Sequence, residues 1–148
     1  MRYKDTGEVH KDFHLAVDRT ITYIMEHYGE QFLIDLCKRT SQQVYQDIYR
    51  HLKEGDLCAL AEHWQYYYTR EGGEFTLTQD NDQLVLTVTK CPAAEHIIKI
   101  KGSLSPYYHR FDELLVGSWC EHTPFVSTFT VHNPVSYTIT VRRNHASQ

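Results

Sequence analysis

Hydrophobic residues recur at helical spacing near the start of the chain. Intervals of four, four, three and four residues separate the positions Phe13, Val17, Ile21, Ile24 and Tyr28. This spacing places the five side chains on one face of an amphipathic helix. Gly29 follows directly and is a natural stop, because glycine readily adopts the left-handed backbone that ends many helices. The pattern therefore predicts a helix that ends at about Tyr28.

Two further helical segments are predicted before the pattern changes. Helical spacing continues from about Gln31 to Lys53, with a polar middle at Lys38 to Gln43 where a bend or a break is expected. Asp56 is a suitable N-cap for the next helix, because its carboxylate can accept a free backbone N–H. The apolar face of that helix comprises Leu57, Leu60, Ala61, Trp64 and Tyr68. Gly72 and Gly73 end the helical half of the chain.

The hydrophobic period changes to two in the second half. Phe75 and Leu77 alternate with threonines, Asp80 to Asp82 supply turn residues, and alternation returns over 84–88. A second alternating pair covers 125–131 and 135–141, with Asn133 and Pro134 at the turn. Each pair is typical of an antiparallel hairpin. Between the hairpins, the apolar stretch Phe111 to Val116 predicts only one or two helical turns.

Helices first and antiparallel strands afterwards predict an α+β fold. We expect the N-terminal helices to pack on a roughly four-stranded antiparallel sheet made of the two hairpins. No repeat or low-complexity linker divides the sequence, so residues 1–148 are predicted to form a single domain.

Composition narrows the functional classes. A net charge of −4 with scattered basic residues argues against a nucleic-acid partner. A content of 41% hydrophobic and 23% charged residues is typical of a globular protein, and no apolar run is long enough to span a membrane. No apolar signal segment follows Met1 to Asp5, and this predicts a cytoplasmic protein. The four cysteines lie far apart without a CxxC pair and are expected to be reduced: Cys37, Cys58, Cys91 and Cys120.

Cys91 stands where an alternating strand meets a short helix. Pro92 suits the first position of that helix, since its missing N–H would be unpaired there anyway, and Cys91 then becomes the N-cap. A sulfur at this place faces free backbone N–H groups and the positive end of the helix dipole. Its pKa is expected to fall below the ordinary value of about 8.5, which favours a nucleophile or a metal ligand. The alternative is a small apolar residue that fills the corner.

Two acid–base partners for Cys91 are suggested by spacing. Glu95 lies four residues later, on the same helical face, where it can act as a base or orient a water; it can equally form a surface ion pair with Lys99. In an extended segment before the second hairpin, Cys120 and His122 project to the same side. His122 can then deprotonate Cys120, or Cys91, Cys120 and His122 can together ligate zinc or iron, although the spacing fits no standard zinc signature.

Aromatic and basic residues suggest the wall of a ligand pocket. Tyr67 and Tyr108 combine an apolar ring with a hydroxyl group, which suits a small-molecule site. Arg110 can pair with a substrate carboxylate, and His132 can face either a pocket or water. Trp64 and Tyr68 share the apolar face of their helix and are assigned to the core.

The stretch from Phe75 to Val131 resembles the L-2-amino-thiazoline-4-carboxylic acid hydrolase-like proteins and the related 4VR ligand-binding domains. The resemblance rests on the helical first half, the strand that runs into Cys91-Pro92, a second cysteine at Cys120 and the closing strand pair. It implies a small α+β domain that binds or hydrolyses small organic molecules, with metal binding through Cys and His in the 4VR relatives. The chain departs from the pattern in lacking a further cysteine in its final strands, where Thr130, His132 and Thr138 stand.

Three functional hypotheses follow. The first is a hydrolase-like enzyme for a compact, cyclic or open, carboxylate-bearing metabolite, with Cys91, Glu95 and His122 as catalytic groups. Its substrate would be bound by the side chains Tyr67, Tyr108, Arg110 and His132. The second is a non-catalytic sensor of a small molecule or a metal ion. The third is an accessory subunit of a larger complex, and association with further copies of the same chain is left open.

Overall fold

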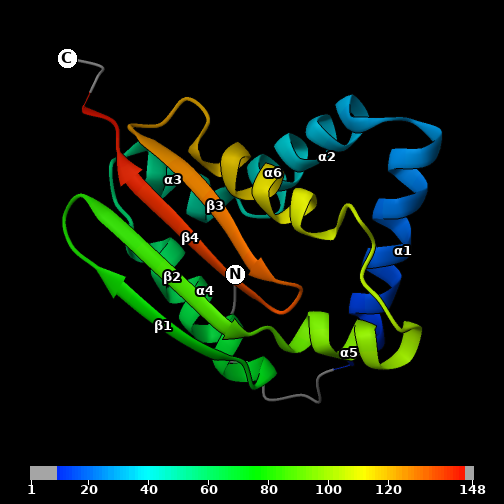
Figure 1. Ribbon diagram of the computed structural model, residues 1–148. Helices are drawn as coiled ribbons and strands as arrows, with labels where there is room; N and C mark the ends of the chain where they lie inside the picture. Colours follow the sequence, from blue (N-terminus) through cyan, green and yellow to red (C-terminus); the bar gives the residue numbers. More distant parts are fainter. Residues whose placement is uncertain (1–9, 146–148) are drawn as a thin grey trace.

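The computed structural model describes residues 10–145, which form six helices and one four-stranded antiparallel sheet (Figure 1). The helices are α1 (Asp12–His27), α2 (Glu30–Gln43), α3 (Gln46–Lys53), α4 (Cys58–Glu71), α5 (Pro92–Lys101) and α6 (Tyr108–Cys120). The strands are β1 (Glu74–Gln79), β2 (Gln83–Lys90), β3 (Phe125–Asn133) and β4 (Ser136–Arg143). The predicted α+β class with N-terminal helices is confirmed.

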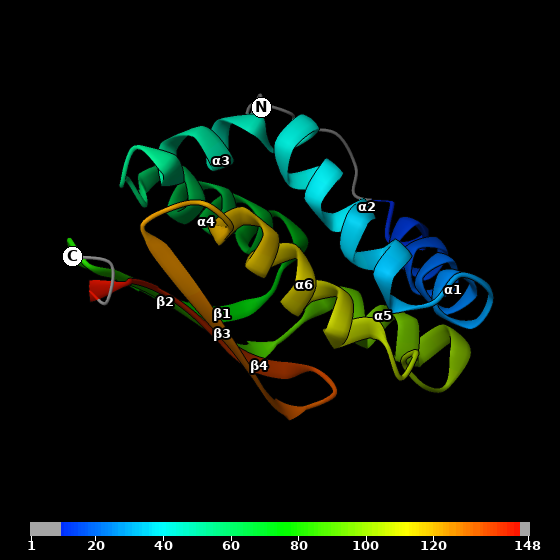
Figure 2. The same ribbon diagram turned by 90° about the horizontal axis from the view of Figure 1, so that it is seen from above.

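The two hairpins join into one sheet. The strand order is β1-β2-β4-β3, so β2 and β4 pair although they are far apart in sequence. Leu86 of β2 lies opposite Ile139 of β4, and both side chains are buried on the face toward the helices. Figure 2 shows the helices gathered on that side of the sheet. The opposite face carries partly exposed threonines, as expected for an antiparallel sheet that is covered on one side.

The helical half follows the predicted pattern closely. α1 ends at His27, and Gly29 has a φ of 79°, in the left-handed region that favours glycine. The segment from Gln31 to Lys53 is interrupted at Val44 and Tyr45, which separate α2 from α3. Asp56 accepts a hydrogen bond from the backbone N–H of Cys58 at 2.9 Å, at the start of α4.

The prediction for the stretch between the hairpins is wrong in extent. Instead of one or two turns at 111–116, the chain forms the 13-residue helix α6, which packs against α2 and β3. Its inward face carries Tyr108, Val116 and Trp119, so tertiary packing stabilises a helix whose apolar pattern is broken by polar residues and a glycine. Cys120, which was expected in an extended segment, is the last residue of this helix.

A buried carboxylate of α1 is hydrogen-bonded to the end of α5 and to the loop between α5 and α6. Asp18 is fully buried and accepts hydrogen bonds from Lys101 Nζ at 2.7 Å and from the backbone N–H of Ser105 at 2.8 Å. The hydroxyl of Thr22 donates to Ser105 Oγ at 2.7 Å. These contacts hold α1 beside α5 and fix where α6 begins (Figure 1).

None of the helices within residues 10–145 has the length and apolar character needed to cross a membrane. The segment Met1 to Asp5, on which the cytoplasmic prediction depends, lies outside the described residues.

Candidate functional site

Cys91 caps helix α5, as the sequence predicts, but the expected lowering of its pKa is wrong. The residue is 2% exposed. Burial has the largest effect and raises the pKa of the Cys91 thiol, while hydrogen bonds from the backbone of Ala94 and from the Tyr137 hydroxyl offset only part of that rise. The protein interior disfavours the charged thiolate more strongly than the helix N-terminus favours it. The thiol is therefore neutral at physiological pH.

Tyrosine hydroxyl groups lie next to this thiol. Tyr137 donates to Cys91 Sγ at 3.6 Å, and the hydroxyls of Tyr68 and Tyr137 are 2.5 Å apart. Because the Tyr137 proton is directed to the sulfur, the Tyr68 hydroxyl is the donor between the two tyrosines. Burial raises the pKa of both tyrosines well above the usual range, so both stay protonated. Cys91 therefore ends a buried chain of hydrogen bonds.

We expect Cys91 to resist alkylation in the folded protein, because it is buried and protonated, whereas Cys58 is exposed. Iodoacetamide should modify Cys91 at least about tenfold more slowly than Cys58, as measured by peptide mass spectrometry. In denaturant the two rates should become similar. Equal rates in the folded protein would show that Cys91 is an accessible, activated thiol.

The predicted metal site of Cys91, Cys120 and His122 does not form. Cys120 is buried at the end of α6, and burial raises its pKa to about 12. His122 follows in a left-handed conformation with a φ of 58°, and its side chain is 77% exposed. The helix end and this turn place the two side chains apart, so they do not project together as in a strand. Within residues 10–145, no group of three or more His, Cys, Asp or Glu side chains is arranged to hold a metal ion.

Two further predicted site residues face solvent. Glu95 does not reach the thiol or Lys99; its carboxylate pairs with Lys90 at 3.8 Å on the surface. His132 lies on the outward face of the sheet, where its Nε2 is 2.9 Å from the Thr138 hydroxyl. The alternation of β3 explains the second result, because Phe129 and Val131 lie on the other face of the strand from His132.

Arg110 is also held at the surface. Its Nε donates to Glu30 Oε1 at 2.6 Å, and another guanidinium nitrogen donates to Glu113 Oε2 at 2.6 Å. The guanidinium is thus occupied by two carboxylates of the protein and is not placed to bind a substrate acid. Of the predicted ligand-binding residues, Tyr67 and Tyr108 remain on the inner side of the helices.

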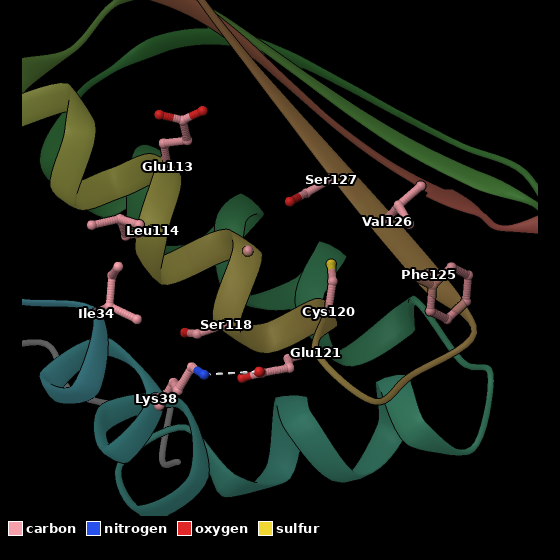
Figure 3. A pocket seen from close by; sticks show the side chains of 11 residues that line it. Ile34, Lys38, Glu113, Leu114, Ser118, Cys120, Glu121, Phe125, Val126 and Ser127 are labelled. Carbon is pink, nitrogen blue, oxygen red and sulfur yellow. Dashed lines mark ion pairs between the residues drawn. The ribbon is translucent and has the colours of Figure 1, made fainter. Parts of the chain in front are cut away.

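A surface pocket of about 460 Å³ lies between α2, α6 and β3 (Figure 3). Lys38 and Glu121 form an ion pair of 2.9 Å at its edge. The Ser118 hydroxyl donates to backbone carbonyls, and Ser127 hydrogen-bonds the Cys120 thiol. These polar side chains already have protein partners, and the raised pKa of the Cys120 thiol keeps it protonated.

Asp112 is the residue on the inner side of α6 that stands out chemically. Burial raises the pKa of its carboxyl to about 7, yet its side chain is 29% exposed. The neighbouring protein disfavours the charged form, and the exposed part of the side chain remains in contact with solvent. Asp112 is therefore a partly buried carboxyl.

Asp112 acts electrostatically on groups from several elements of the fold. Burial is the largest cause of the raised pKa of seven groups, and the negative charge of Asp112 adds to the rise in each: Cys37, Tyr45, Tyr67, Tyr68, Cys91, Tyr108 and Tyr137. They come from α2, the α2–α3 junction, α4, the β2–α5 junction, α6 and β4. We call Asp112 and these neighbours the Asp112 site.

Two buried nitrogens around the Asp112 site lack partners within the described residues. They are Trp119 Nε1 and His109 Nδ1, the latter 4.0 Å from the Asp112 carboxylate. His109 Nε2 is 3.0 Å from the Pro134 carbonyl, which can only accept, so Nε2 carries the proton and Nδ1 presents a lone pair in the neutral ring. Buried polar groups without partners call for a water or a ligand.

Aromatic rings form one wall of the site. The Trp119 centroid lies 5.2 Å from that of Tyr45 and 6.0 Å from that of His63, and His63 stacks with Tyr67 at 6.5 Å. Burial lowers the pKa of His63 to about 4, so this ring is neutral at physiological pH. The site thus combines one acidic group with neutral aromatic surfaces.

Comparison with known proteins yields little. No protein-family model matches the chain, and no curated protein does. A solved structure of an H-NOX protein mutant from K. algicida, in its Fe(II) unliganded form, is similar with a TM-score of 0.49 and 11% identity, covering 95% of this chain and 77% of that one.

The sequence analysis does not select Asp112. The signal that could have identified it is its helical spacing with two aromatic residues, because Tyr108 precedes it by four positions and Trp119 follows it by seven. These intervals place a carboxylate in the middle of an apolar helix face, where acidic residues are rare unless they are paired or functional. A helix predicted only over 111–116 is too short to reveal that face.

Proposed function

We propose that the protein binds a compact small molecule in the space beside Asp112. The observation that carries the proposal is the partly buried carboxyl of Asp112, which lies 4.0 Å from the unpartnered Nδ1 of His109. The unpartnered Trp119 Nε1 supplies a hydrogen-bond donor in the same region. Binding of a small molecule is also what the resemblance to the 4VR ligand-binding domains implies.

Binding is better supported than hydrolysis through Cys91. A thiol nucleophile needs a deprotonated sulfur and a base within reach, whereas burial keeps Cys91 protonated. The two predicted bases, Glu95 and His122, lie at the surface. The hydrogen bond from Tyr137 instead suits a thiol that helps to position the tyrosine wall. The sensor hypothesis is therefore preferred over the hydrolase hypothesis.

A pair of leucine variants tests the location of the site. Leu115 lies three residues after Asp112 and packs against the core between the helices and the sheet and against the smaller buried cluster of α1 and α2. Its neighbour Leu114 packs against the smaller cluster and lines the surface pocket of Figure 3. Leu115→Phe should fill the proposed space beside Asp112 and weaken ligand binding at least about tenfold, because the larger side chain occupies the volume that the ligand needs. Leu114→Phe is the matched control and should bind as the wild type does.

Three probes of one shape serve for the measurement: cyclohexanol, cyclohexylamine and cyclohexanecarboxylic acid. Binding is followed by calorimetry and by the combined fluorescence of Trp64 and Trp119. At least one probe should bind to the wild type, and its affinity should fall in Leu115→Phe. If binding survives Leu115→Phe but is lost in Leu114→Phe, the ligand occupies the surface pocket and the proposal is wrong.

A further inference from the structure

We propose that the region around the turn between α1 and α2 is the contact surface of a weak homodimer. Four large apolar side chains are exposed there, and we call them the Phe32 patch: Tyr23, Tyr28, Phe32 and Leu36. The turn lies at the end of the molecule away from the sheet, where a second copy can approach it (Figure 1). The proposal concerns association of the protein with itself and is independent of the proposed ligand.

The aromatic rings of the Phe32 patch form one continuous surface. Tyr28 and Phe32 are stacked with their ring centroids 5.1 Å apart, and the centroids of Tyr23 and Tyr28 are separated by 6.1 Å. His27 stacks on Tyr23 at 4.1 Å and extends the surface along α1. The three rings of the patch are each about half exposed. A contiguous apolar surface of this kind is typical of a protein–protein contact site.

The arrangement of the patch suits a partner related by a two-fold axis. The Tyr28 ring stacks on Phe32, and Leu36 follows Phe32 by one helical turn in the other direction along the chain. In a two-fold dimer, any contact between residues i and j is repeated between j and i. An axis at Phe32 therefore places this ring against its own copy and Tyr28 against Leu36 of the other copy. The patch is complementary to itself.

Charged side chains around the patch favour the same partner. Two cations and two anions are exposed there: Arg19, Glu26, Asp35 and Arg39. Within the described residues, Glu26 and Arg39 form no ion pair. Glu26 lies six residues before Phe32 and Arg39 seven after it, so the same axis brings Glu26 of each copy toward Arg39 of the other. A nucleic acid or an anionic membrane would instead require clustered cations.

The size of the patch predicts a weak dimer. An aromatic side chain buries about 150 to 250 Å² when it is fully covered, so each half-exposed ring of the patch offers about 100 Å². With Leu36 and the stems of the charged side chains, each copy contributes about 500 Å², or about 1,000 Å² for the pair. This area is at the lower end for specific interfaces, where association is transient. We expect a Kd of about 100 μM.

Sedimentation velocity between about 10 μM and about 1 mM tests the proposal. The wild type should pass from monomer to dimer over this range. Phe32→Asp should weaken dimerisation at least about tenfold, because it places a charge at the apolar centre of the interface. Phe13→Asp is the matched control. Phe13 is 67% exposed but lies at the start of α1, outside the patch, so this variant should dimerise as the wild type does.

A charge reversal tests how the two copies are oriented. Arg39→Glu should weaken the dimer at least about threefold, because it places two acidic side chains opposite each other. Adding Glu26→Arg to Arg39→Glu should restore the affinity, since each pair is then reversed in sign. If the double variant stays as weak as Arg39→Glu, the two residues do not meet and the two-fold arrangement is wrong.

Three results would overturn the assignment of a second copy as the partner. The first is a wild type that stays monomeric at about 1 mM. The second is equal dimerisation of Phe32→Asp and Phe13→Asp, which would place the contact elsewhere. In the third, the monomer binds vesicles of anionic lipid and Phe32→Asp removes that binding, so the patch contacts a membrane surface. Dimerisation is measured without a ligand, so its failure and that of the ligand site are distinguishable.

Discussion

Asp112→Asn is expected to stabilise the protein at about pH 8 by up to about 4 kcal/mol. Burial raises the pKa of this carboxyl from 3.8 to about 7, a difference of roughly three pKa units at about 1.4 kcal/mol each. The estimate is an upper bound, because the side chain is 29% exposed and water reduces the cost of the charge. Asparagine has a similar shape and carries no charge to bury.

The pH dependence has a defined sign. Below about pH 4 the carboxyl is protonated in both the folded and the unfolded chain, so aspartate and asparagine should give similar stability. Between about pH 4 and about pH 7 the unfolded chain loses the proton while the folded protein keeps it, and the wild type loses stability relative to the variant. Above the folded pKa the difference should stay constant.

Urea denaturation of both proteins at about pH 4, 6 and 8 measures this difference, and subtraction cancels the titration of groups that they share. Glu113→Gln should show no such pH-dependent gain, because Glu113 is exposed and paired with Arg110. A variant Asp112→Asn that is less stable than the wild type at about pH 8 would mean that the ionised carboxylate has a stabilising partner in the folded protein.

Asp18→Ala is expected to destabilise the protein by about 1 to 3 kcal/mol, the usual cost of leaving a buried hydrogen-bond donor without its acceptor. The change leaves the backbone N–H of Ser105 without its acceptor in the interior and removes the partner of Lys101. Because Lys101 is 32% exposed, it can turn to water, so the larger part of the loss should come from Ser105 and the vacated volume.

Thermal and urea unfolding of two further variants show which lost contact causes the destabilisation. Asp18→Asn keeps an oxygen for the Ser105 N–H and should cost less than alanine. Asp12→Ala, which removes a 91% exposed carboxylate from the same helix, should change stability by no more than about 0.5 kcal/mol. Equal losses for Asp18→Asn and Asp18→Ala would assign the effect to the ion pair with Lys101 instead.

The sequence predicts elements whose signal is local. The helix α1, the alternation of the hairpins and the cap at Cys91 each depend on residues within one or two turns or along one strand, and the structure confirms them. The predicted stripe along α1 is buried only in its middle, because Phe13 and Tyr28 at its ends are exposed. The pairing of β2 with β4 joins segments that are about fifty residues apart and that carry similar alternation, so composition does not specify it. For α6, packing against α2 and β3 outweighs the interrupted apolar pattern.

The candidate site was harder to predict for the same reason. Spacing correctly places Cys91 at a helix N-terminus, but the direction of its pKa shift depends on how much protein surrounds it, which only the complete fold determines. His122 and Arg110 have suitable chemistry and are directed outward by a left-handed turn and by two surface carboxylates. The raised pKa of Asp112 comes from burial, which depends on how segments far apart in the sequence pack together.

The position of Tyr137 in the last strand has a consequence for synthesis of the protein. Tyr137 completes the surroundings of Cys91 and Tyr68, and β4 is the strand through which the first hairpin is held to the second. A nascent chain that has emerged only as far as β3 therefore lacks both the Tyr137 hydroxyl beside Cys91 and the strand that joins the hairpins. The sheet is completed only after the ribosome has released β4, so a chain that ends before Tyr137 cannot join its two hairpins.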